Sequence, residues 1–364
     1  MVAPQRPVIV VEDDPFPRLL QVILDPEAPQ ARVAAFSDFF AHDLPDFTGW
    51  CEALRARIGS LYPAEVRLVA NEAGLLASLP GAQVVVVEAL AIGASEIAAA
   101  GGTLRIVQKY GTVTSRIDLA ACAQAGVRVL TLRRRANIST AEHALALLLA
   151  LARKITETAG LVSVEQLRAA GYSPTRYDRA HTPNVNWARI SGLRTLFSQQ
   201  FGIIGLGEIG RELALRAGAL GMRIVYFQRQ QLSLAEEEHY QATYCGLEEL
   251  LARSDCVSLH LPGGPATRGF IGRRELAIIK PGALLINVSR PQLVDRAALV
   301  EALASGKLGG FGLDPPYDEP GQPDDPLLKF HNVIVTPHLG GSPRSNALGD
   351  FEELLLNLAQ ALSQ

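Results

Sequence analysis

The sequence predicts an α/β protein of two domains, each built around a parallel sheet with helices on both faces. The first observation is length: 364 residues are more than one hydrophobic core usually holds and are comfortable for two. The second is pattern. From Phe201 onward, short apolar runs alternate regularly with amphipathic helical runs. Such alternation is typical of a parallel sheet whose strands are joined by crossover helices.

The regular second half supplies most of the expected elements. Its strand-like runs are Phe201–Ile204, Arg223–Phe227, Cys256–Leu261, Ala283–Val288, Gly309–Leu313 and Val333–Val335. The helical runs between them are Ile209–Leu220, Gly246–Ala252, Arg273–Ile279 and Asp295–Ala304. Two of these helices are followed by turn signals, Pro281-Gly282 and Ser305-Gly306.

The first half is also α/β, but it is less regular. Expected strands are Pro7–Val11, Val84–Val87, Arg105–Gln108 and Val127–Leu130, with a helix over Ile117–Ala125. A longer helix is expected over Ser139–Lys154, because Ser139 and Glu142 have the spacing of a capping box at its start. The last segment, Ser345–Leu362, has helical periodicity and follows the final strand of the second domain. We expect it to return to the first domain, which gives domains of residues 1–138 plus 339–364 and residues 139–338.

Composition and charge exclude several classes of function. The net charge is −3, so there is no basic surface of the kind that nucleic acid requires. No apolar run approaches the ~20 residues that span a bilayer, and Met1–Pro7 lacks the pattern of a secretory signal. The four cysteines are scattered, which argues against a metal site and against a disulfide framework. We therefore expect a cytoplasmic protein without metal, membrane or nucleic-acid partner.

The acidic run Glu12–Asp14 follows the first expected strand, as in a phosphorylation receiver domain. Nothing downstream supplies the matching Asp and Lys of such a domain within one small unit. We interpret the run as a solvated loop.

A glycine-rich motif predicts the binding of a dinucleotide. Gly205-Leu206-Gly207-Glu208-Ile209-Gly210 fits G-x-G-x-x-G, follows an apolar strand and opens a helix. In such a motif the first glycine makes the tight turn, the second lets a pyrophosphate approach the backbone, and the third lets helix and strand pack closely. The helix N-terminus adds N–H donors and the positive end of its dipole.

The end of the next strand bears on the choice of cofactor. An NAD site normally places Asp or Glu there to bind the ribose 2′-hydroxyl. The corresponding residue is Gln228, and Arg229 follows it. No carboxylate repels a 2′-phosphate, and a guanidinium is available to pair with one. The prediction is NADP in preference to NAD, although Arg229 could equally be a solvated residue.

Three segments that follow predicted strands carry candidate catalytic residues. They are Ile286–Arg290, Leu313–Pro320 and Thr336–Gly341. Ligands of open α/β sheets bind beyond the carboxyl ends of the strands, so Arg290, Glu319 and His338 are expected at one crevice. Taken singly, the Asp-Glu-Pro and Thr-Pro-His segments could be ordinary turns.

These motifs, in this order, resemble the D-isomer-specific 2-hydroxyacid dehydrogenase family, which includes glyoxylate and hydroxypyruvate reductases and phosphoglycerate dehydrogenases. The resemblance covers residues 100–345, from Leu104–Asp118 through Ala141–Ala144 and the glycine motif to Thr336–His338. It implies two Rossmann-like domains, with substrate bound by the first and a dinucleotide by the second. The implied reaction moves hydride between NADP(H) and C2 of a small 2-oxo or 2-hydroxy acid.

The resemblance also implies residue roles. Arg290 would bind the substrate carboxylate and polarise the carbonyl, His338 would be the general acid and base, and Glu319 would keep the imidazole protonated near neutral pH. Asp314 would orient the nicotinamide carboxamide. The remaining implied cofactor contacts are Thr140, Gly205, Gly207, Glu208, Ile209, Gly210, Gln228, Arg229, Pro262, Ser289 and Gly340. The implied substrate contacts besides Arg290 are Tyr110, Gly111, Thr112 and Val113.

The chain departs from the family pattern at three places, one of them directly after Arg290, where Pro291-Gln292 stand in place of small residues. Val113 stands where the substrate-carboxylate loop usually has glycine, and Arg116 adds a cation to that loop. Arg133–Arg135 replace a small, glycine-containing segment. These arginines either read a second anionic group or form interdomain or surface salt bridges, and the second interpretation is favoured. The long irregular segment Gly160–Gln200 lies where relatives have a dimerisation arm, so a homodimer is expected.

Two other functions stay open from the sequence. One is a phosphoglycerate dehydrogenase-type enzyme that uses NAD. The other is a corepressor-like binding protein that senses the cofactor without turnover. The complete set of Arg290, Glu319 and His338 argues against the second alternative.

Overall fold

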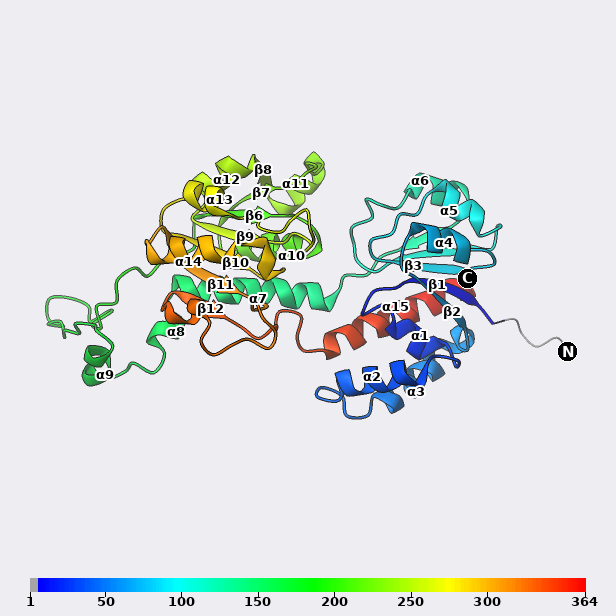
Figure 1. Cartoon of the computed structure of the whole chain (residues 1–364), viewed down its shortest axis with the longest axis horizontal. Helices are drawn as coiled ribbons and strands as arrows, with labels where there is room; N and C mark the ends of the chain where they lie inside the picture. Colours follow the sequence, from blue (N-terminus) through cyan, green and yellow to red (C-terminus); the bar gives the residue numbers. More distant parts are fainter. Residues whose placement is uncertain (1–5) are drawn as a thin grey trace. The chain divides into compact units, whose positions relative to one another are not determined.

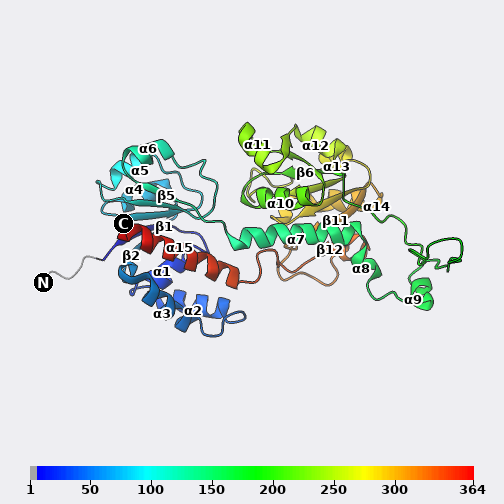
Figure 2. The same ribbon diagram turned by 180° about the vertical axis from the view of Figure 1, so that it is seen from behind.

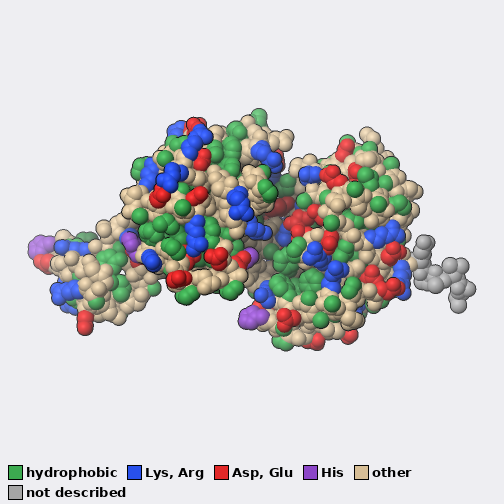
Figure 3. Space-filling model, in the orientation of Figure 1, with side chains coloured by type: hydrophobic (Ala, Val, Ile, Leu, Met, Phe, Trp, Pro, Cys, Tyr) green, Lys and Arg blue, Asp and Glu red, His purple; other side chains and the backbone are tan. Residues whose placement is uncertain are grey.

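The computed structural model describes residues 6–364, which fold into two compact units (Figure 1). Unit 1 comprises the described residues up to Asn137 together with Gly341–Gln364, and unit 2 comprises Ile138–Gly340. Acidic and basic side chains are interspersed on the face of each unit seen in Figure 3. Among the described helices, none is both long and apolar enough to cross a membrane.

Unit 1 contains a five-stranded parallel sheet of order β2-β1-β3-β4-β5. The strands are β1 (Val8–Glu12), β2 (Glu65–Val69), β3 (Val84–Val87), β4 (Ile106–Lys109) and β5 (Arg128–Leu130). The helices are α1 (Leu19–Leu24), α2 (Gln30–Phe40), α3 (Phe47–Ile58), α4 (Glu72–Ser78), α5 (Ala94–Ala99), α6 (Leu119–Gln124) and α15 (Ser345–Ser363). The unit thus has the 2-1-3-4-5 order of one common doubly wound sheet.

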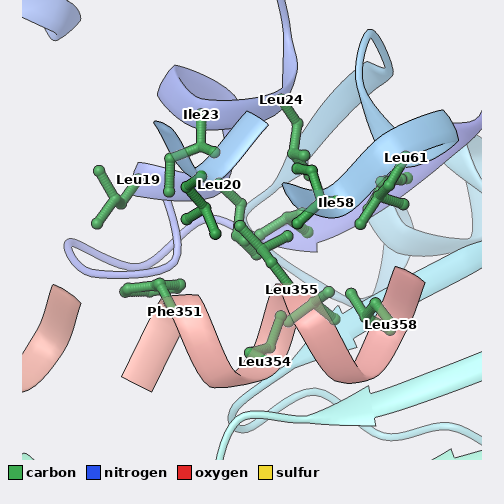
Figure 4. Close-up of a cluster of buried hydrophobic side chains, with 14 of the residues drawn as sticks. Leu19, Leu20, Ile23, Leu24, Ile58, Leu61, Phe351, Leu354, Leu355 and Leu358 are labelled. Atoms are coloured by element: carbon green, nitrogen blue, oxygen red, sulfur yellow. The ribbon is translucent and has the colours of Figure 1, made fainter. Parts of the chain in front are cut away.

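The C-terminal helix α15 is part of the core of unit 1, as predicted. Its residues Phe351, Leu354, Leu355 and Leu358 are fully buried against side chains of α1 and α3 (Figure 4). On the other face of the sheet, α4, α5 and α6 cover a second buried cluster around Leu75. Both faces of the sheet are therefore covered, and its central strand β3 is the wholly apolar run Val84–Val87.

Unit 2 contains a seven-stranded parallel sheet of order β12-β11-β10-β9-β6-β7-β8. The strands are β6 (Gln200–Ile204), β7 (Arg223–Phe227), β8 (Ala242–Tyr244), β9 (Cys256–Leu259), β10 (Ala283–Asn287), β11 (Leu308–Leu313) and β12 (Val333–Val335). The helices are α8 (Ile155–Thr158), α9 (Val164–Ala169), α10 (Glu208–Ala219), α11 (Leu234–Tyr240), α12 (Leu247–Arg253), α13 (Arg273–Ile278) and α14 (Arg296–Ala304). The long helix α7 (Arg135–Ala152) begins in unit 1 and continues into unit 2.

Helices also cover both faces of the second sheet. Helices α7 and α10 bury one apolar cluster on one face, and α12, α13 and α14 bury another on the opposite face (Figures 1 and 2). Helix α7 packs closely over β11, because a Cβ atom added to Gly312 would lie 3.1 Å from Cβ of Leu147. The predicted fold class, two doubly wound parallel sheets with a returning C-terminal helix, is confirmed.

The predicted start of the long helix is wrong. Helix α7 begins at Arg135, so Ser139 lies inside the helix and is not its N-cap. The cap comes from another part of the chain: the buried carboxylate of Asp350 accepts hydrogen bonds from the Arg135 backbone N–H (2.8 Å) and from its guanidinium (3.1 Å). A carboxylate at the positive end of the helix dipole stabilises the earlier start.

The interpretation of Glu12 as a solvated residue is also wrong. Glu12 ends β1, and its Oε2 accepts hydrogen bonds from the backbone N–H groups of Glu88, Ala89 and Leu90 at 2.6, 2.7 and 3.0 Å. These N–H groups follow β3, the neighbour of β1 in the sheet. The carboxylate therefore satisfies the donors at the point where the strand order of unit 1 reverses.

Candidate active site

The predicted site residues of unit 2 follow neighbouring strands of its sheet. The glycine motif follows β6, Pro262 follows β9, and the turn with Arg290 follows β10. Glu319 lies beyond β11 and His338 lies beyond β12. Because all seven strands are parallel, these segments leave the sheet at the same edge. The strand order reverses between β6 and β9, the place where such sheets bind ligands.

The glycine motif has the shape that a pyrophosphate needs. Gly205 has φ +95°, and a Cβ there would lie 2.6 Å from the carbonyl oxygen of His260. A Cβ on Gly210 would lie 2.3 Å from the carbonyl oxygen of Gly205, so helix and strand pack too closely for a side chain. A Cβ on Gly207 would meet no atom within 4 Å. Gly207 is the N-cap of α10, whose first residues are Glu208 and Ile209. The residues present therefore fit a dinucleotide.

Gln228 shapes the glycine motif from the end of β7. Its Oε1 accepts a hydrogen bond from the Leu206 backbone N–H (3.1 Å), and its Nε2 donates to the carbonyl of Gln230 (2.6 Å). Arg229 is exposed beside it. The strand end thus presents a neutral amide and a guanidinium, and no carboxylate stands at the position that usually binds a ribose 2′-hydroxyl.

Arg290 stands on a turn that is fixed by a buried asparagine. Asn287 is fully buried at the end of β10, where its Nδ2 donates to the carbonyl of Arg290 (2.8 Å) and its Oδ1 accepts from the Ser289 N–H (3.1 Å). The Ser289 hydroxyl donates to the carbonyl of Leu259 in the neighbouring strand (2.9 Å). Asn287 had no predicted role, although a polar residue closing the apolar run Ala283–Asn287 was a signal for one.

His338 and Glu319 form a hydrogen-bonded pair. The Nδ1 atom of His338 lies 2.8 Å from Oε1 of Glu319, and both side chains are about half exposed. With Nδ1–H donating to a carboxylate, the imidazole presents Nε2 to a ligand. His338 has φ +61°, a left-handed conformation that costs a non-glycine residue about 1–3 kcal/mol and is concentrated at functional sites.

Asp314 anchors the loop that carries His338. Its Oδ1 accepts from the Thr336 hydroxyl (2.7 Å) and the Leu339 N–H (2.8 Å), and its Oδ2 accepts from the Gly340 N–H (2.8 Å). The residue is only 2% exposed. The resemblance implied that Asp314 orients a carboxamide, and that role stays a prediction. In the structure both of its oxygens accept hydrogen bonds from the segment that carries His338.

Three other predicted contacts of unit 2 have defined places. Thr140, in α7, lies beside Gly340, because a Cβ on Gly340 would be 3.5 Å from the Thr140 Cγ2 and 3.0 Å from Oδ2 of Asp314. The exposed Pro262 follows β9, and its carbonyl accepts a hydrogen bond from the Thr267 hydroxyl (2.7 Å). Thr140, Asp314 and Gly340, each predicted as a cofactor contact, therefore lie close together in unit 2.

The predicted substrate loop belongs to unit 1 and follows β4. Tyr110 is 1% exposed, stacks on Phe351 with ring centroids 5.1 Å apart, and lies under the Arg134 guanidinium at 4.1 Å. Its side chain is therefore a core residue. Gly111 is buried with φ +152°, Thr112 is exposed and Val113 is half-buried. Of these four residues, Thr112 is the exposed one.

Three of the four unusual arginines form ion pairs inside unit 1. Arg116 pairs with Glu72 at 3.0 Å, and Arg134 pairs with Glu88 at 2.6 Å. Arg135 pairs with Asp350 at 3.1 Å and with Glu353 at 2.8 Å. Burial raises the pKa of the Glu88 carboxyl, and the Arg134 charge opposes that shift. Salt bridging, the favoured interpretation, describes these three residues.

Comparison with known proteins identifies the family. Residues 145–340 match the D-isomer specific 2-hydroxyacid dehydrogenase, NAD binding domain. The chain is 36% identical over 256 residues to a glyoxylate reductase of Thermococcus litoralis, covering 70% of this chain and 73% of that protein. It is 32% identical over 303 residues to a D-3-phosphoglycerate dehydrogenase of Archaeoglobus fulgidus, covering 82% of this chain and 53% of that protein. The chain thus spans about half the length of the phosphoglycerate dehydrogenases that it matches.

Solved structures agree with this result. The TT0316 protein of Thermus thermophilus is 33% identical, with a TM-score of 0.53 and coverage of 86% of this chain and 94% of that one. A D-mandelate dehydrogenase of Rhodotorula graminis, 24% identical with a TM-score of 0.56, shares the fold over 97% of this chain and 93% of its own. A doubly wound unit with this glycine motif, and with an arginine, a glutamate and a histidine after its strands, is typical of a protein that binds a nicotinamide dinucleotide. The chain belongs to the D-isomer specific 2-hydroxyacid dehydrogenase family.

Proposed function

We propose that the protein transfers hydride between NADP(H) and C2 of a small 2-oxo or 2-hydroxy acid, as a glyoxylate or hydroxypyruvate reductase does. The observation that carries the proposal is the His338–Glu319 pair, with 2.8 Å between Nδ1 and Oε1, at the sheet edge that also bears the glycine motif. A proton donor at the same end of the sheet as a dinucleotide-binding motif fits the reduction of a carbonyl by hydride.

The chain's own residues perform the remaining steps. Arg290 binds the C1 carboxylate through its planar guanidinium and polarises the C2 carbonyl. His338 gives the proton on Nε2 to the C2 oxygen as that oxygen gains charge, and it takes the proton back in the oxidative direction. Glu319 accepts from Nδ1–H and fixes the orientation of the imidazole, which leaves Nε2 available to the substrate. The nicotinamide, when bound, supplies or accepts the hydride.

The test of the catalytic assignment is His338→Ala. We expect kcat for NADPH oxidation with glyoxylate to fall by about 100-fold or more, since general acid catalysis contributes about 10²–10⁴-fold. Cofactor affinity, measured by fluorescence titration, should change little. His331→Ala is a matched control, because His331 is an exposed histidine that precedes β12 in the same unit. Undiminished turnover by the His338 variant contradicts the assignment.

The preference for NADP over NAD rests on Gln228 and Arg229. No carboxylate repels a 2′-phosphate there, and the exposed Arg229 guanidinium can pair with one. The test compares kcat/KM for NADPH and NADH in the wild type and in Arg229→Gln. Wild-type preference for NADPH should shrink about tenfold in the variant, the amount expected for one charge-assisted contact. A clear wild-type preference for NADH overturns this part of the proposal.

The relatives support two substrate types, since the names of those that match include glyoxylate reductase and D-3-phosphoglycerate dehydrogenase. Rates of NADPH or NADH oxidation with glyoxylate, hydroxypyruvate, pyruvate and 3-phosphohydroxypyruvate distinguish these two substrate types.

We also propose a cytoplasmic homodimer formed through residues 160–200. In that segment Val162, Val185 and Phe197 are 77, 75 and 69% exposed, an apolar surface that a partner subunit can cover. A monomer in sedimentation analysis at working concentration contradicts the dimer.

A further inference from the structure

We propose that a cavity beside Arg290 binds a second anionic group of the substrate, a carboxylate or phosphate beyond C2, through the guanidinium of Arg268. This inference rests on the proposed function and narrows its substrate class to dianionic 2-oxo acids. The binding group lies wholly in unit 2, on the segments that follow β9 and β10.

The cavity has the size and chemistry of a small-anion site. Its volume is about 390 Å³, within the range of small-molecule sites. Its lining consists of Gly263, Gly264, Pro265, Thr267, Arg268, Arg290, Gln292 and Leu293. Two arginines and one glutamine thus line the same space, and none of these eight residues is acidic.

Among the described residues neither arginine has a carboxylate partner, in contrast to other arginines of unit 2. Arg273, on the neighbouring helix α13, pairs with Glu301, and Arg296 pairs with Asp325 at 2.8 Å. In the described residues, the Arg290 side chain donates only to the Ser289 carbonyl (2.8 Å), and Arg268 forms no ion pair. Two like charges that share one cavity repel each other, so an anion between or beside them is bound favourably.

Both arginines stand on segments held by the protein. A Cβ on Gly263 would lie 2.6 Å from Cγ of Arg290, so the aliphatic part of that side chain rests directly on the glycine. The Gly269 N–H donates to the carbonyl of Gln292 (2.7 Å), which ties the Arg268 turn to the Arg290 segment. Within the same turn, the Thr267 hydroxyl donates a hydrogen bond to the Pro262 carbonyl. A cavity organised before binding loses less entropy when an anion enters.

We assign a different anionic group of the substrate to each of the two arginines. The proposed function uses Arg290 for the C1 carboxylate, which leaves the Arg268 fork for a second anion in the same cavity. The planar fork suits both carboxylate and phosphate. Three of the arginines that first suggested a second anion site, Arg116, Arg134 and Arg135, are neutralised by carboxylates of unit 1.

The test is the selectivity of Arg268→Gln. We compare kcat/KM for oxaloacetate and for 3-phosphohydroxypyruvate with kcat/KM for pyruvate, which lacks the second anion. The wild type should favour at least one dianionic acid, and the ratio of dianion to pyruvate should fall about tenfold or more in the variant. Which dianion loses more tells a carboxylate site from a phosphate site. Arg253→Gln, in an exposed pair with Glu249 on α12, is the matched control and should keep the wild-type ratio.

A second readout does not need turnover. Calorimetric titration of the wild-type protein with inorganic phosphate should show binding that is about tenfold weaker in Arg268→Gln and unchanged in Arg253→Gln. If the wild type turns over pyruvate but the ratio stays within twofold in the Arg268 variant, the inference is wrong and the proposed function stands. If no 2-oxo acid is turned over, the proposed function fails, and the phosphate titration alone decides whether the cavity binds anions.

Discussion

Replacing Asp314 by asparagine tests how the protein positions its proton donor. The substitution keeps the shape of the side chain but replaces one acceptor oxygen by an N–H₂ donor. Oδ2 now accepts from the Gly340 N–H, and Oδ1 accepts from the Leu339 N–H and the Thr336 hydroxyl. Whichever way the amide is turned, one backbone N–H faces another donor in a site that is 2% exposed.

The expected cost follows from these contacts. A buried donor without an acceptor costs about 1–3 kcal/mol, and the remaining bonds lose the strength that a charged acceptor gives them. The total is about 2–4 kcal/mol. For a unit of this size each kcal/mol lowers the thermal midpoint by about 2–4 °C, so a fall of roughly 4 °C or more is expected. The freed loop carries His338, and kcat should fall by about tenfold or more because a misplaced catalytic group is less effective.

The measurement combines thermal unfolding with steady-state kinetics. Thr336→Val is the matched variant, since it removes the hydroxyl that donates to Asp314 and contacts Nε2 of His143 (2.9 Å) but leaves both backbone bonds to Asp314 in place. We expect this variant to lower the free energy of unfolding by about 1 kcal/mol. An Asp314→Asn protein with an unchanged midpoint and an unchanged kcat would falsify the argument that this carboxylate holds the His338 loop.

Three further predictions concern the rest of unit 2. Gly207→Ala should leave the thermal midpoint unchanged, because its Cβ meets no atom, but weaken cofactor binding in a titration by about tenfold. Gly210→Ala should lower the midpoint by several degrees, because its Cβ would lie 2.3 Å from a carbonyl oxygen. Equal effects of the two variants contradict the assignment of the cradle. Burial lowers the pKa of His260 to about 3, so the unfolded chain takes up a proton below about pH 6.5 and the folded protein does not. This proton uptake should lower the free energy of unfolding of the wild type by about 2 kcal/mol between pH 7 and pH 5. Urea unfolding of His260→Gln should show a smaller decrease over the same pH range than the wild type shows. Asn287→Ala should lower stability by about 2 kcal/mol and reduce kcat/KM, since the turn with Arg290 loses two bonds; wild-type kinetics would argue against this role.

Much of the site could be predicted because its residues follow strands. Strand-ending motifs are local in sequence, and the parallel sheet brings their ends to one edge, so Arg290, Glu319 and His338 needed no distance information. The bonds that position them were missed. Asn287 had no predicted role, and Asp314 was predicted as a cofactor contact, not as the partner of the His338 loop. Both residues bond to backbone groups of particular turns, and no periodic pattern in the sequence indicates such bonds. The first half was predicted less completely for a similar reason: β2 and the helices α1 to α4 lack a regular alternation.

The sequence by itself determined the class of fold and the glycine motif, and it predicted the candidate proton donor and its carboxylate. These features depend on short motif spacings and on hydrophobic periodicity, and such local patterns indicate strands, helices and turns directly. The tertiary structure alone decided where α7 begins, since the cap on Arg135 comes from Asp350 in the last helix of the chain. It also decided which arginines are neutralised and which, like Arg268, face a cavity without a carboxylate. The reason is that charge pairing and capping depend on distances between residues far apart in the sequence, which folding alone establishes.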